Sequence, residues 1–242
     1  MDIIYSVIIP AYNEKNWLPQ TLIRLKTAMA DSGLAGEIIV VDNNSTDKTA
    51  QIAAAHGARV IFEERNQISR ARNAGAGAAR GKYFIFLDAD TLLPPGLLKT
   101  ALKNLESGAF CGGGAWVSSL EPHPAAVRRS IDMWNRLSRA FSWAAGCFIY
   151  TLRQGFEAVG GFSEKVYASE EIWFSRQLRA WGKSRGLTFR IIMHPPIVTS
   201  VRKINWFTPR QAFLLIIILL FPLALRSRLL CSFWYSRPGQ KD

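Results

Sequence analysis

The strongest constraint on the fold is a regular alternation of short apolar runs and helix-like segments over residues 5–87. Four apolar runs have the length and composition of strands, at residues 5–10, 37–42, 59–63 and 83–87. The segments between them, at residues 16–30, 48–56 and 69–80, have helical spacing or small residues. This order with short connections predicts an α/β fold, in which helices cover a parallel sheet through right-handed crossovers. With 242 residues, the chain makes one large domain, alone or with an appendage.

Polar side chains follow three of these strands at the point where each one ends. Tyr12 follows the first strand, Asp42 closes the second, and Asp88 and Asp90 follow the fourth. We expect Pro10 to end the pairing of the first strand. Because ligands bind beyond the carboxyl ends of parallel strands, these side chains are predicted to line one site. Two carboxylates as close in sequence as Asp88 and Asp90 repel each other unless a cation or several hydrogen-bond donors compensate. The alternative to a binding site is that both acids are solvated at a strand end that continues into a turn.

The charge is unevenly distributed along the chain. Residues 1–119 contain 12 Lys or Arg and 11 Asp or Glu, whereas residues 120–242 contain 18 and 7. The second half is therefore expected to meet something negative: phosphates, nucleic acid or an anionic membrane surface. The three cysteines have no CxxC spacing, so neither a disulfide framework nor a zinc site is indicated. The first residues lack the basic start of a signal peptide, and we expect a cytoplasmic location.

Beyond residue 110 the pattern becomes irregular. We expect strands at residues 111–117 and 188–193, the second of them ending at His194, and an aromatic and basic stretch lies between them. The earlier motif Gly75-Ala-Gly77 has Arg80 at the sixth position of a dinucleotide fingerprint, where glycine is needed. We therefore interpret it as small residues that let a helix pack closely.

Four sequence motifs together resemble a known family. They are SVIIPAYNE, VVDNNSTDKT, ARNAGAGAARGKYFIFLDADT and FEAVGGFSEKVYASEEIWF. Over residues 4–182 they resemble the family 2 glycosyltransferases of the GT-A fold, in the same order and approximate spacing. The resemblance implies a Rossmann-like sheet with helices on both faces, in a catalytic domain of residues 1–205. It divides this domain into a nucleotide-binding part of about residues 1–110 and an acceptor part of about residues 111–205.

The resemblance also implies the chemistry. It predicts a metal-dependent, inverting transfer of a sugar from a nucleotide-sugar donor to a hydroxyl of a saccharide or lipid-linked acceptor. Asp88 and Asp90 match the DxD signature, and carboxylate oxygens suit Mn²⁺ or Mg²⁺. We expect Asp90 to bind the metal directly and Asp88 to contact ribose or a metal-bound water, with His194 as a candidate third ligand. The metal would stabilise the leaving nucleoside diphosphate.

Other residues match nucleotide-binding positions of the family. Tyr12 would stack on the base and Asp42 would accept a base N–H, although a rim aromatic and a turn or cap residue are the respective alternatives. Asn44 stands where many relatives have glycine, and asparagine tolerates the left-handed conformation that this turn needs. Arg202 and Lys203 would close over the diphosphate. The remaining candidates are Pro10, Ala11, Glu14, Arg72 and Ala89.

An acidic pair precedes the predicted helix at residues 172–181. By resemblance, its second member, Glu171, is the general base that deprotonates the acceptor. The family usually has aspartate here, and the extra methylene of glutamate moves the carboxylate by about an ångström. The alternative is that both acids only favour the first turn of the helix.

The C-terminal segment is apolar and basic. Residues 212–225 carry no charge, but a spanning helix needs about 20 residues. Arginines and aromatics flank this segment, so we expect residues 206–242 to form a hydrophobic helical tail at the cytoplasmic face of a membrane. The alternative is a buried helix that closes the core.

Three rival functions remain open. A polyprenyl-phosphate sugar synthase fits the same motifs. A sugar-phosphate nucleotidyltransferase needs a glycine-rich basic loop after the first strand, which residues 11–14 do not provide. A basic adaptor for membranes or nucleic acid leaves Asp88, Asp90 and Glu171 without a purpose, and we expect no nucleic-acid partner.

Overall fold

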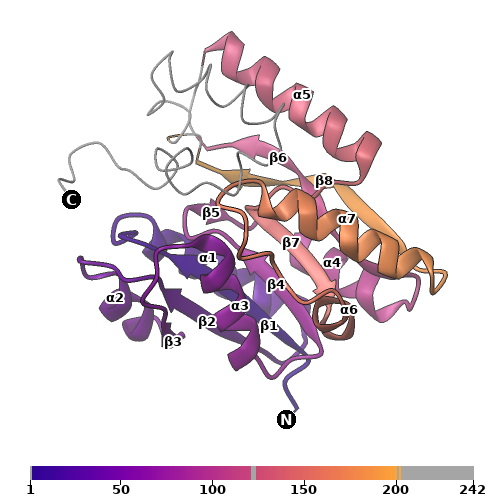
Figure 1. Ribbon diagram of the computed structural model, residues 1–242. Helices are drawn as coiled ribbons and strands as arrows, with labels where there is room; N and C mark the ends of the chain where they lie inside the picture. Colours follow the sequence, from indigo (N-terminus) through magenta and orange to yellow (C-terminus); the bar gives the residue numbers. More distant parts are fainter. Residues whose placement is uncertain (1, 121–123, 201, 203–242) are drawn as a thin grey trace.

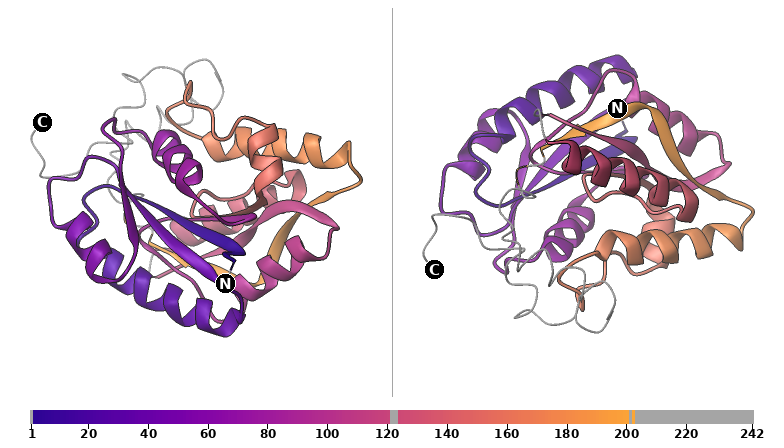
Figure 2. Two further views of the ribbon diagram at one scale, coloured as in Figure 1. Left: turned by 90° about the horizontal axis from the view of Figure 1, so that it is seen from below. Right: turned by 90° about the horizontal axis from the view of Figure 1, so that it is seen from above.

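The computed structural model describes residues 2–120, 124–200 and 202. Its centre is an eight-stranded sheet with the strand order β3-β2-β1-β4-β7-β6-β8-β5. Helices lie on both sides of this sheet, as the views in Figures 1 and 2 show. The expected α/β architecture with helices on both faces is confirmed.

The first half of the sheet is parallel, as predicted. Its strands are β1 (Tyr5–Ala11), β2 (Gly36–Asp42), β3 (Arg59–Phe62) and β4 (Tyr83–Leu87). The helices that connect them are α1 (Leu18–Ser32), α2 (Thr49–Ala55) and α3 (Ile68–Ala78). Pro10 ends the pairing only on one side: the ladder with β4 stops at Ile8, whereas the ladder with β2 continues to Ala11. All four strands direct their carboxyl ends to one edge of the sheet.

The second half of the sheet is mixed. Its elements are β5 (Thr91–Leu92), α4 (Leu97–Glu106), β6 (Phe110–Ser119), α5 (Ala125–Phe141), β7 (Phe148–Leu152), α6 (Arg153–Ala158), α7 (Glu170–Lys183) and β8 (Thr188–Thr199). Strand β7 is antiparallel to both β4 and β6, β8 is parallel to β6, and β5 is antiparallel to β8. One sheet therefore runs continuously through the two expected parts of the catalytic domain.

Strand β8 is longer than expected. The sequence predicts an end near His194, but the strand continues to Thr199. A register shift makes this possible, because residues 193–196 lie opposite Trp116 alone while Ile192 pairs with Ala115 and Ile197 with Val117. The shift accommodates two prolines without ending the strand.

Two apolar layers hold the helices on the sheet. One layer contains side chains of α1 and α4, and the other contains side chains of α3, α6 and α7. Every residue of β4 is buried, which confirms a strand covered on both faces. A Cβ at Gly75 would lie 2.4 Å from a methyl carbon of Ile8 and 2.9 Å from one of Val41. This confirms that Gly75 lets α3 pack closely on the sheet.

Within the part of the chain that the structure describes, no helix combines the length and the apolar character needed to cross a bilayer. Lys203 and the predicted tail of residues 206–242 lie outside the described residues.

Candidate functional site

Backbone and side-chain hydrogen bonds join the loops that follow β1, β2 and β3. The Asn13 side-chain oxygen accepts the N–H of Thr46 at 2.8 Å, and the Asn13 N–H donates to Ser45 Oγ at 3.0 Å. Asn43 Nδ2 donates to the Arg65 carbonyl at 2.6 Å, so the third loop is held as well. The loops after β1, β2 and β3 therefore form one polar surface at the carboxyl edge of the sheet, whereas the sequence prediction grouped the ends of the first, second and fourth strands.

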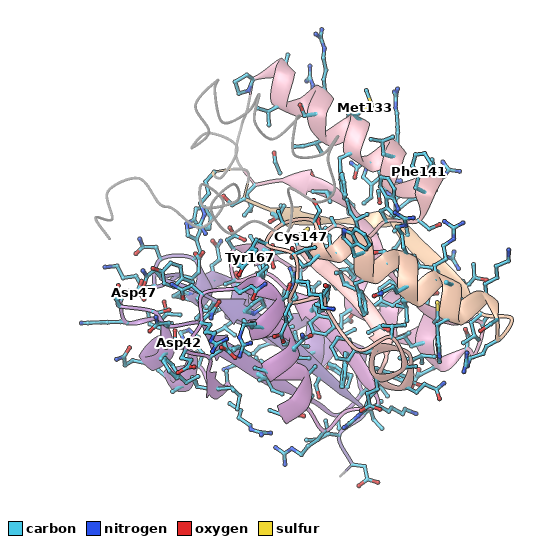
Figure 3. The ribbon with its side chains drawn as sticks, in the orientation of Figure 1. Asp42, Asp47, Met133, Phe141, Cys147 and Tyr167 are labelled. Atoms are coloured by element: carbon cyan, nitrogen blue, oxygen red, sulfur yellow. The ribbon has the colours of Figure 1, made fainter. Side chains whose placement is uncertain are left out.

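A cavity of about 570 Å³ lies beside this surface. Its lining comes from the turn after β2, the segment before and within α3, and the segment before α7. The lining residues are Asn44, Glu64, Arg65, Asn66, Gln67, Arg70, Glu164 and Tyr167. Figure 3 labels Asp42 at the end of β2 and Tyr167 on the segment that approaches it from the other half. A ligand in this cavity would therefore touch both halves of the sheet.

The segment before α7 is clamped onto α3. Gln67 is buried, and its Nε2 donates to the carbonyls of Glu164 at 2.8 Å and of Val166 at 3.1 Å. Asn73 binds the backbone of Phe162 in both directions, donating to its carbonyl at 2.9 Å and accepting its N–H at 3.0 Å. No pattern in the sequence singled out Gln67, Glu164 and Asn73, although Asn73 stands directly after Arg72 in the quoted motif.

The expected nucleotide-binding residues adopt the predicted turn geometry. Asn44 has φ of 64°, so it takes the left-handed conformation expected of this position. Asp42 Oδ1 accepts the N–H of Ser45 at 3.1 Å, which is the turn role weighed as an alternative. Tyr12 is partly exposed and follows Ala11, the last residue of β1. Base binding by Tyr12 and Asp42 stays a prediction.

Arg72 is buried at the centre of the site, with a side chain 1% exposed. Its Nη1 lies 2.6 Å from Glu170 Oε1, and its Nη2 lies 3.1 Å from Asp88 Oδ1 and 2.9 Å from the Gly146 carbonyl. Burial alone would lower the pKa of Arg72, but the charges of Asp88 and Glu170 raise it above its ordinary value. These contacts go to protein groups rather than to solvent. Arg72 is therefore a buried cation that joins two acids, and its expected contact with the nucleotide stays a prediction.

Two adjacent acids open α7 and have different surroundings. Glu170 is buried and paired with Arg72, whereas Glu171 keeps part of its surface open to solvent. The Glu171 carboxyl group nevertheless lies in a densely packed region. Burial, followed by repulsion from Glu170, raises the pKa of Glu171 to about 8. Neighbouring carboxyl groups with different environments are suited to different tasks.

Arg202 brings two further acids together. Its Nη2 lies 2.6 and 2.7 Å from the two carboxylate oxygens of Glu14 and 2.9 Å from Asp90 Oδ2. Burial would lower the pKa of Arg202, but hydrogen bonding to Glu14 and the charge of Asp90 raise it. Its guanidinium also lies over the Trp17 ring, 5.4 Å from the centroid. Arg202 therefore lies beside the DxD segment, close to where the resemblance expected it.

The acids around Arg202 fit a divalent cation. Carboxylate oxygens of Glu14 and Asp90 converge on one positively charged nitrogen, and hard oxygen ligands are those that Mn²⁺ and Mg²⁺ prefer. Asp88 instead directs one oxygen to Arg72. Among the described residues, no group of three or more His, Cys, Asp and Glu side chains forms a ready metal cluster. A cation would thus enter beside Asp90, at the position that the Arg202 guanidinium now neutralises.

His194 does not join this group. It is exposed on β8, opposite Trp116. Thr199 pairs with Thr91 next to Asp90, so His194 lies five residues further along the strand. Among the described residues it forms no cluster of potential metal ligands with Asp88 and Asp90. The role of His194 as a third metal ligand stays a prediction.

The remaining small residues shape the backbone of the site. Pro10 and Ala11 complete β1, and the Ala89 carbonyl accepts the hydroxyl of Thr21 at 2.9 Å. This bond from α1 fixes the peptide between Asp88 and Asp90.

The parallel-then-mixed sheet, the acidic loop after β4 and the acidic pair opening α7 define a nucleotide-sugar-type GT-A fold. The family model described as glycosyl transferase family 2 matches residues 6–159. The chain belongs to glycosyl transferase family 2.

Two curated relatives illustrate the sequence similarity. An uncharacterised glycosyltransferase of Mycobacterium tuberculosis is 36% identical over 104 residues, which are 43% of this chain and 44% of the relative. The undecaprenyl-phosphate 4-deoxy-4-formamido-L-arabinose transferase of Pseudomonas aeruginosa is 37% identical over 99 residues, which are 38% of this chain and 29% of the relative. The match thus spans less than half the length of these relatives.

Two solved structures illustrate the fold similarity. TarS residues 1–349 of S. aureus, in complex with UDP-GlcNAc, has a TM-score of 0.65 at 17% identity, covering 96% of this chain and 72% of that one. The mannosyltransferase PcManGT of Pyrobaculum calidifontis, in complex with GDP-Man and Mn²⁺, has a TM-score of 0.63 at 23% identity, covering 93% and 63%. At these identities the likeness shows the fold.

Proposed function

We propose that this glycosyltransferase moves a sugar from a nucleotide-sugar donor to a hydroxyl of a lipid-linked or saccharide acceptor, with inversion and with a divalent cation. The observation that carries the proposal is the link made by Arg72. It joins Asp88, after the strand that delivers the DxD segment, to Glu170, the neighbour of Glu171. Donor-side and acceptor-side acids are thereby held in one rigid unit.

Glu171 is the proposed general base. It takes the proton of the acceptor hydroxyl, whose oxygen forms a new bond to the anomeric carbon of the sugar. The bond from that carbon to the diphosphate oxygen breaks, and the nucleoside diphosphate leaves with the electron pair. A carboxyl group with a pKa of about 8 is a stronger base than an ordinary glutamate, which suits proton removal from a hydroxyl.

The donor would occupy the cavity beside Asn44, Gln67 and Tyr167. The bound Mn²⁺ or Mg²⁺ would stabilise negative charge on the leaving diphosphate. Asp90, with Glu14 or Asp88, would hold the cation through carboxylate oxygens. With a cation bound, Arg202 would be able to pair with phosphate oxygens, because the cation would offset the charges of Glu14 and Asp90.

The acceptor class is supported by two observations. The Pseudomonas aeruginosa relative is named as a transferase acting with undecaprenyl phosphate. The second half of this chain is strongly basic and contains an uncharged run at residues 212–225. Both favour a catalytic domain at the cytoplasmic face of a membrane, with an anionic lipid surface as its partner. A polyprenyl-phosphate sugar synthase is the second candidate, because a phosphate acceptor fits the same features.

A transfer assay tests this proposal. The full chain is incubated with radiolabelled UDP- or GDP-sugars, Mn²⁺ and an extract of bacterial lipids, and the products are separated by solubility. We expect label in the lipid or glycan fraction only when donor, cation and acceptor are all present. Treatment with mild acid then distinguishes the candidates. Label on a polyprenyl monophosphate is released as the free monosaccharide, whereas label on a saccharide hydroxyl stays bound to that saccharide. Donor hydrolysis alone, with every acceptor fraction unlabelled, would contradict the proposed transfer.

A further inference from the structure

Helix α5 carries an apolar stripe on its outer side. Met133, Leu137 and Phe141 are 59%, 37% and 48% exposed, which makes them half of the large hydrophobic side chains exposed among the described residues. Their spacing of four residues places them on one side of the helix. Figure 3 shows Met133 and Phe141 along α5, which lies at the periphery of the molecule in Figure 1.

The orientation of this stripe is fixed by the opposite side of the helix. Asn135 is 1% exposed and binds the backbone of Val117 in both directions, at 2.9 Å each. Ser138 is also 1% exposed, and its hydroxyl donates to the Trp143 carbonyl at 2.6 Å. The Asn135 bonds hold α5 on β6, and the burial of Asn135 and Ser138 marks the inner side of the helix. The stripe formed by Met133, Leu137 and Phe141 therefore faces outward.

The border of the stripe is basic. Four exposed arginines, Arg128, Arg129, Arg136 and Arg139, lie on α5 against one acid, Asp132. An apolar stripe bordered by basic residues is the pattern of a helix that lies in the plane of a membrane interface.

Charge decides between the possible occupants of this surface. Residues 203–242 contain six Lys or Arg and one acid, so the chain's own tail would meet the arginines of α5 with like charge. A second copy would do the same, because it would present this same basic helix. An anionic lipid surface complements both the arginines and the tail.

We propose that this outer face of α5 is the surface through which the catalytic domain rests on an anionic lipid bilayer. The stripe enters the interface and the arginines contact the lipid phosphates. The inference deepens the proposed function, because it assigns the membrane partner to one helix.

The same helix is tied to the proposed catalytic helix. Arg179 on α7 donates to the Phe141 carbonyl at 2.9 Å, and Ser175 on α7 accepts the Ala144 N–H at 3.0 Å. Glu171 lies one turn before Ser175 on α7. Docking of α5 would therefore place Glu171 at a fixed height above the lipid surface, where the head of a lipid-linked acceptor is presented.

A site-specific fluorophore tests the proposal on the full chain. Cys231→Ser removes the cysteine of the tail, and Cys111 and Cys147 are buried. Met133→Cys is labelled with an environment-sensitive dye, and Ile23→Cys on α1, 56% exposed, is the matched control. With vesicles of equal phosphatidylglycerol and phosphatidylcholine, we expect a blue shift and loss of iodide quenching at position 133 and neither at position 23.

Two results would overturn the proposal. One is a label at position 133 that stays open to iodide while the chain is bound to vesicles. The other is a label that is shielded before vesicles are added, because the tail or a second copy then covers the stripe.

A charge variant tests the arginines separately. Removing two arginines that each contribute about fivefold to lipid binding lowers vesicle affinity by on the order of 30-fold. We expect this for Arg129→Gln with Arg136→Gln, whereas Arg24→Gln with Lys26→Gln on α1 removes equal charge and leaves affinity nearly unchanged. Equal losses in both variants would show a general charge effect and overturn the assignment to α5.

Nucleotide binding in the same samples separates this inference from the proposed function. Binding of UDP or GDP without contact between α5 and the vesicles would support the proposed function and would contradict the assignment of the membrane surface to α5.

Discussion

Arg72 and Glu170 form a buried ion pair, with 2.6 Å between Nη1 and Oε1 and side chains 1% and 6% exposed. The two residues are far apart in sequence: Arg72 lies on α3, in the first half of the chain, and Glu170 lies on α7, in the second half. Because the same guanidinium also binds Asp88, Arg72 joins the loop after β4 to the start of α7.

Arg72→Met is expected to destabilise the fold by about 3–5 kcal/mol, because it leaves Glu170 buried without its partner. Urea unfolding followed by circular dichroism measures the change. Arg65→Met is the control, since the Arg65 side chain is 70% exposed and its replacement should change stability by less than about 0.5 kcal/mol. Equal effects of the two substitutions would show that the buried pair is not a structural link.

Asp90→Asn is expected to remove the part of nucleoside diphosphate affinity that depends on Mn²⁺ while the fold is retained. The amide replaces a carboxylate oxygen that lies 2.9 Å from Arg202, at the proposed cation position. Calorimetric titration of UDP and GDP, with and without Mn²⁺, measures the effect. Asp31→Asn, at an exposed position of α1, should behave like the unmodified chain. A full Mn²⁺-dependent gain in Asp90→Asn would remove Asp90 from the metal site.

Gln67→Ala is expected to release the segment before α7 from α3. The amide loses its bonds to the carbonyls of Glu164 and Val166, so hydrogen exchange of residues 162–167 should become faster. Donor affinity should fall as well, because Glu164 and Tyr167 line the cavity. Gln51→Ala, at an exposed position of α2, is the control. If residues 162–167 exchange at the same rate in both variants, the clamp is not what holds this segment.

The raised pKa of Glu171 predicts opposite effects of pH on stability and on transfer. Burial and the charge of Glu170 raise the pKa of Glu171 to about 8 in the folded chain, whereas in the unfolded chain it has the ordinary value of about 4.5. Between these values the folded chain holds a proton that the unfolded chain has released, so this contribution to stability is lost as the pH rises from about 4.5 to about 8. Transfer should rise over the upper part of this range, because the base must be deprotonated.

Two variants check this assignment. The free energy of unfolding, measured with urea at several pH values, should no longer show the Glu171 contribution to its pH dependence in Glu171→Gln. Glu170→Gln removes the neighbouring charge and should shift the rising limb of the transfer profile to lower pH. A profile that does not move in Glu170→Gln would indicate that another group controls it.

The sequence predicted the parallel half of the fold because its signals are local. Apolar runs and helical spacing define β1 to β4, and the carboxyl-edge rule then brings Asp42 and Asp88 to one side. The order β7-β6-β8-β5 depends on contacts between strands far apart in the chain, and no local pattern encodes it. The length of β8 was also beyond reach, because Pro195 and Pro196 are accommodated only through pairing with β6.

The site was predicted in its positions more than in its contacts. The Ala-Arg-Asn motif identified Arg72 as important, but only the packed structure shows that its guanidinium turns inward to Glu170. Likewise, Arg202 reaches Glu14 and Asp90 because β8 continues past the prolines to Thr199, which pairs with Thr91 next to Asp90. For His194, the residue type suggested a metal ligand, but the sequence could not show that its position on β8 is exposed and that it forms no cluster with the described acids.

Transfer by Glu171→Gln, measured beside donor binding, tests the central claim most directly. The full-length chain and the variant receive labelled donor, Mn²⁺ and the acceptor fraction under identical conditions, and donor affinity is determined by calorimetry. The account predicts that Glu171→Gln keeps its donor affinity and loses about 10²- to 10⁴-fold in turnover, because the base acts on the acceptor alone. Preserved turnover at saturating donor, with or without weaker binding, would contradict the role of Glu171 as the base.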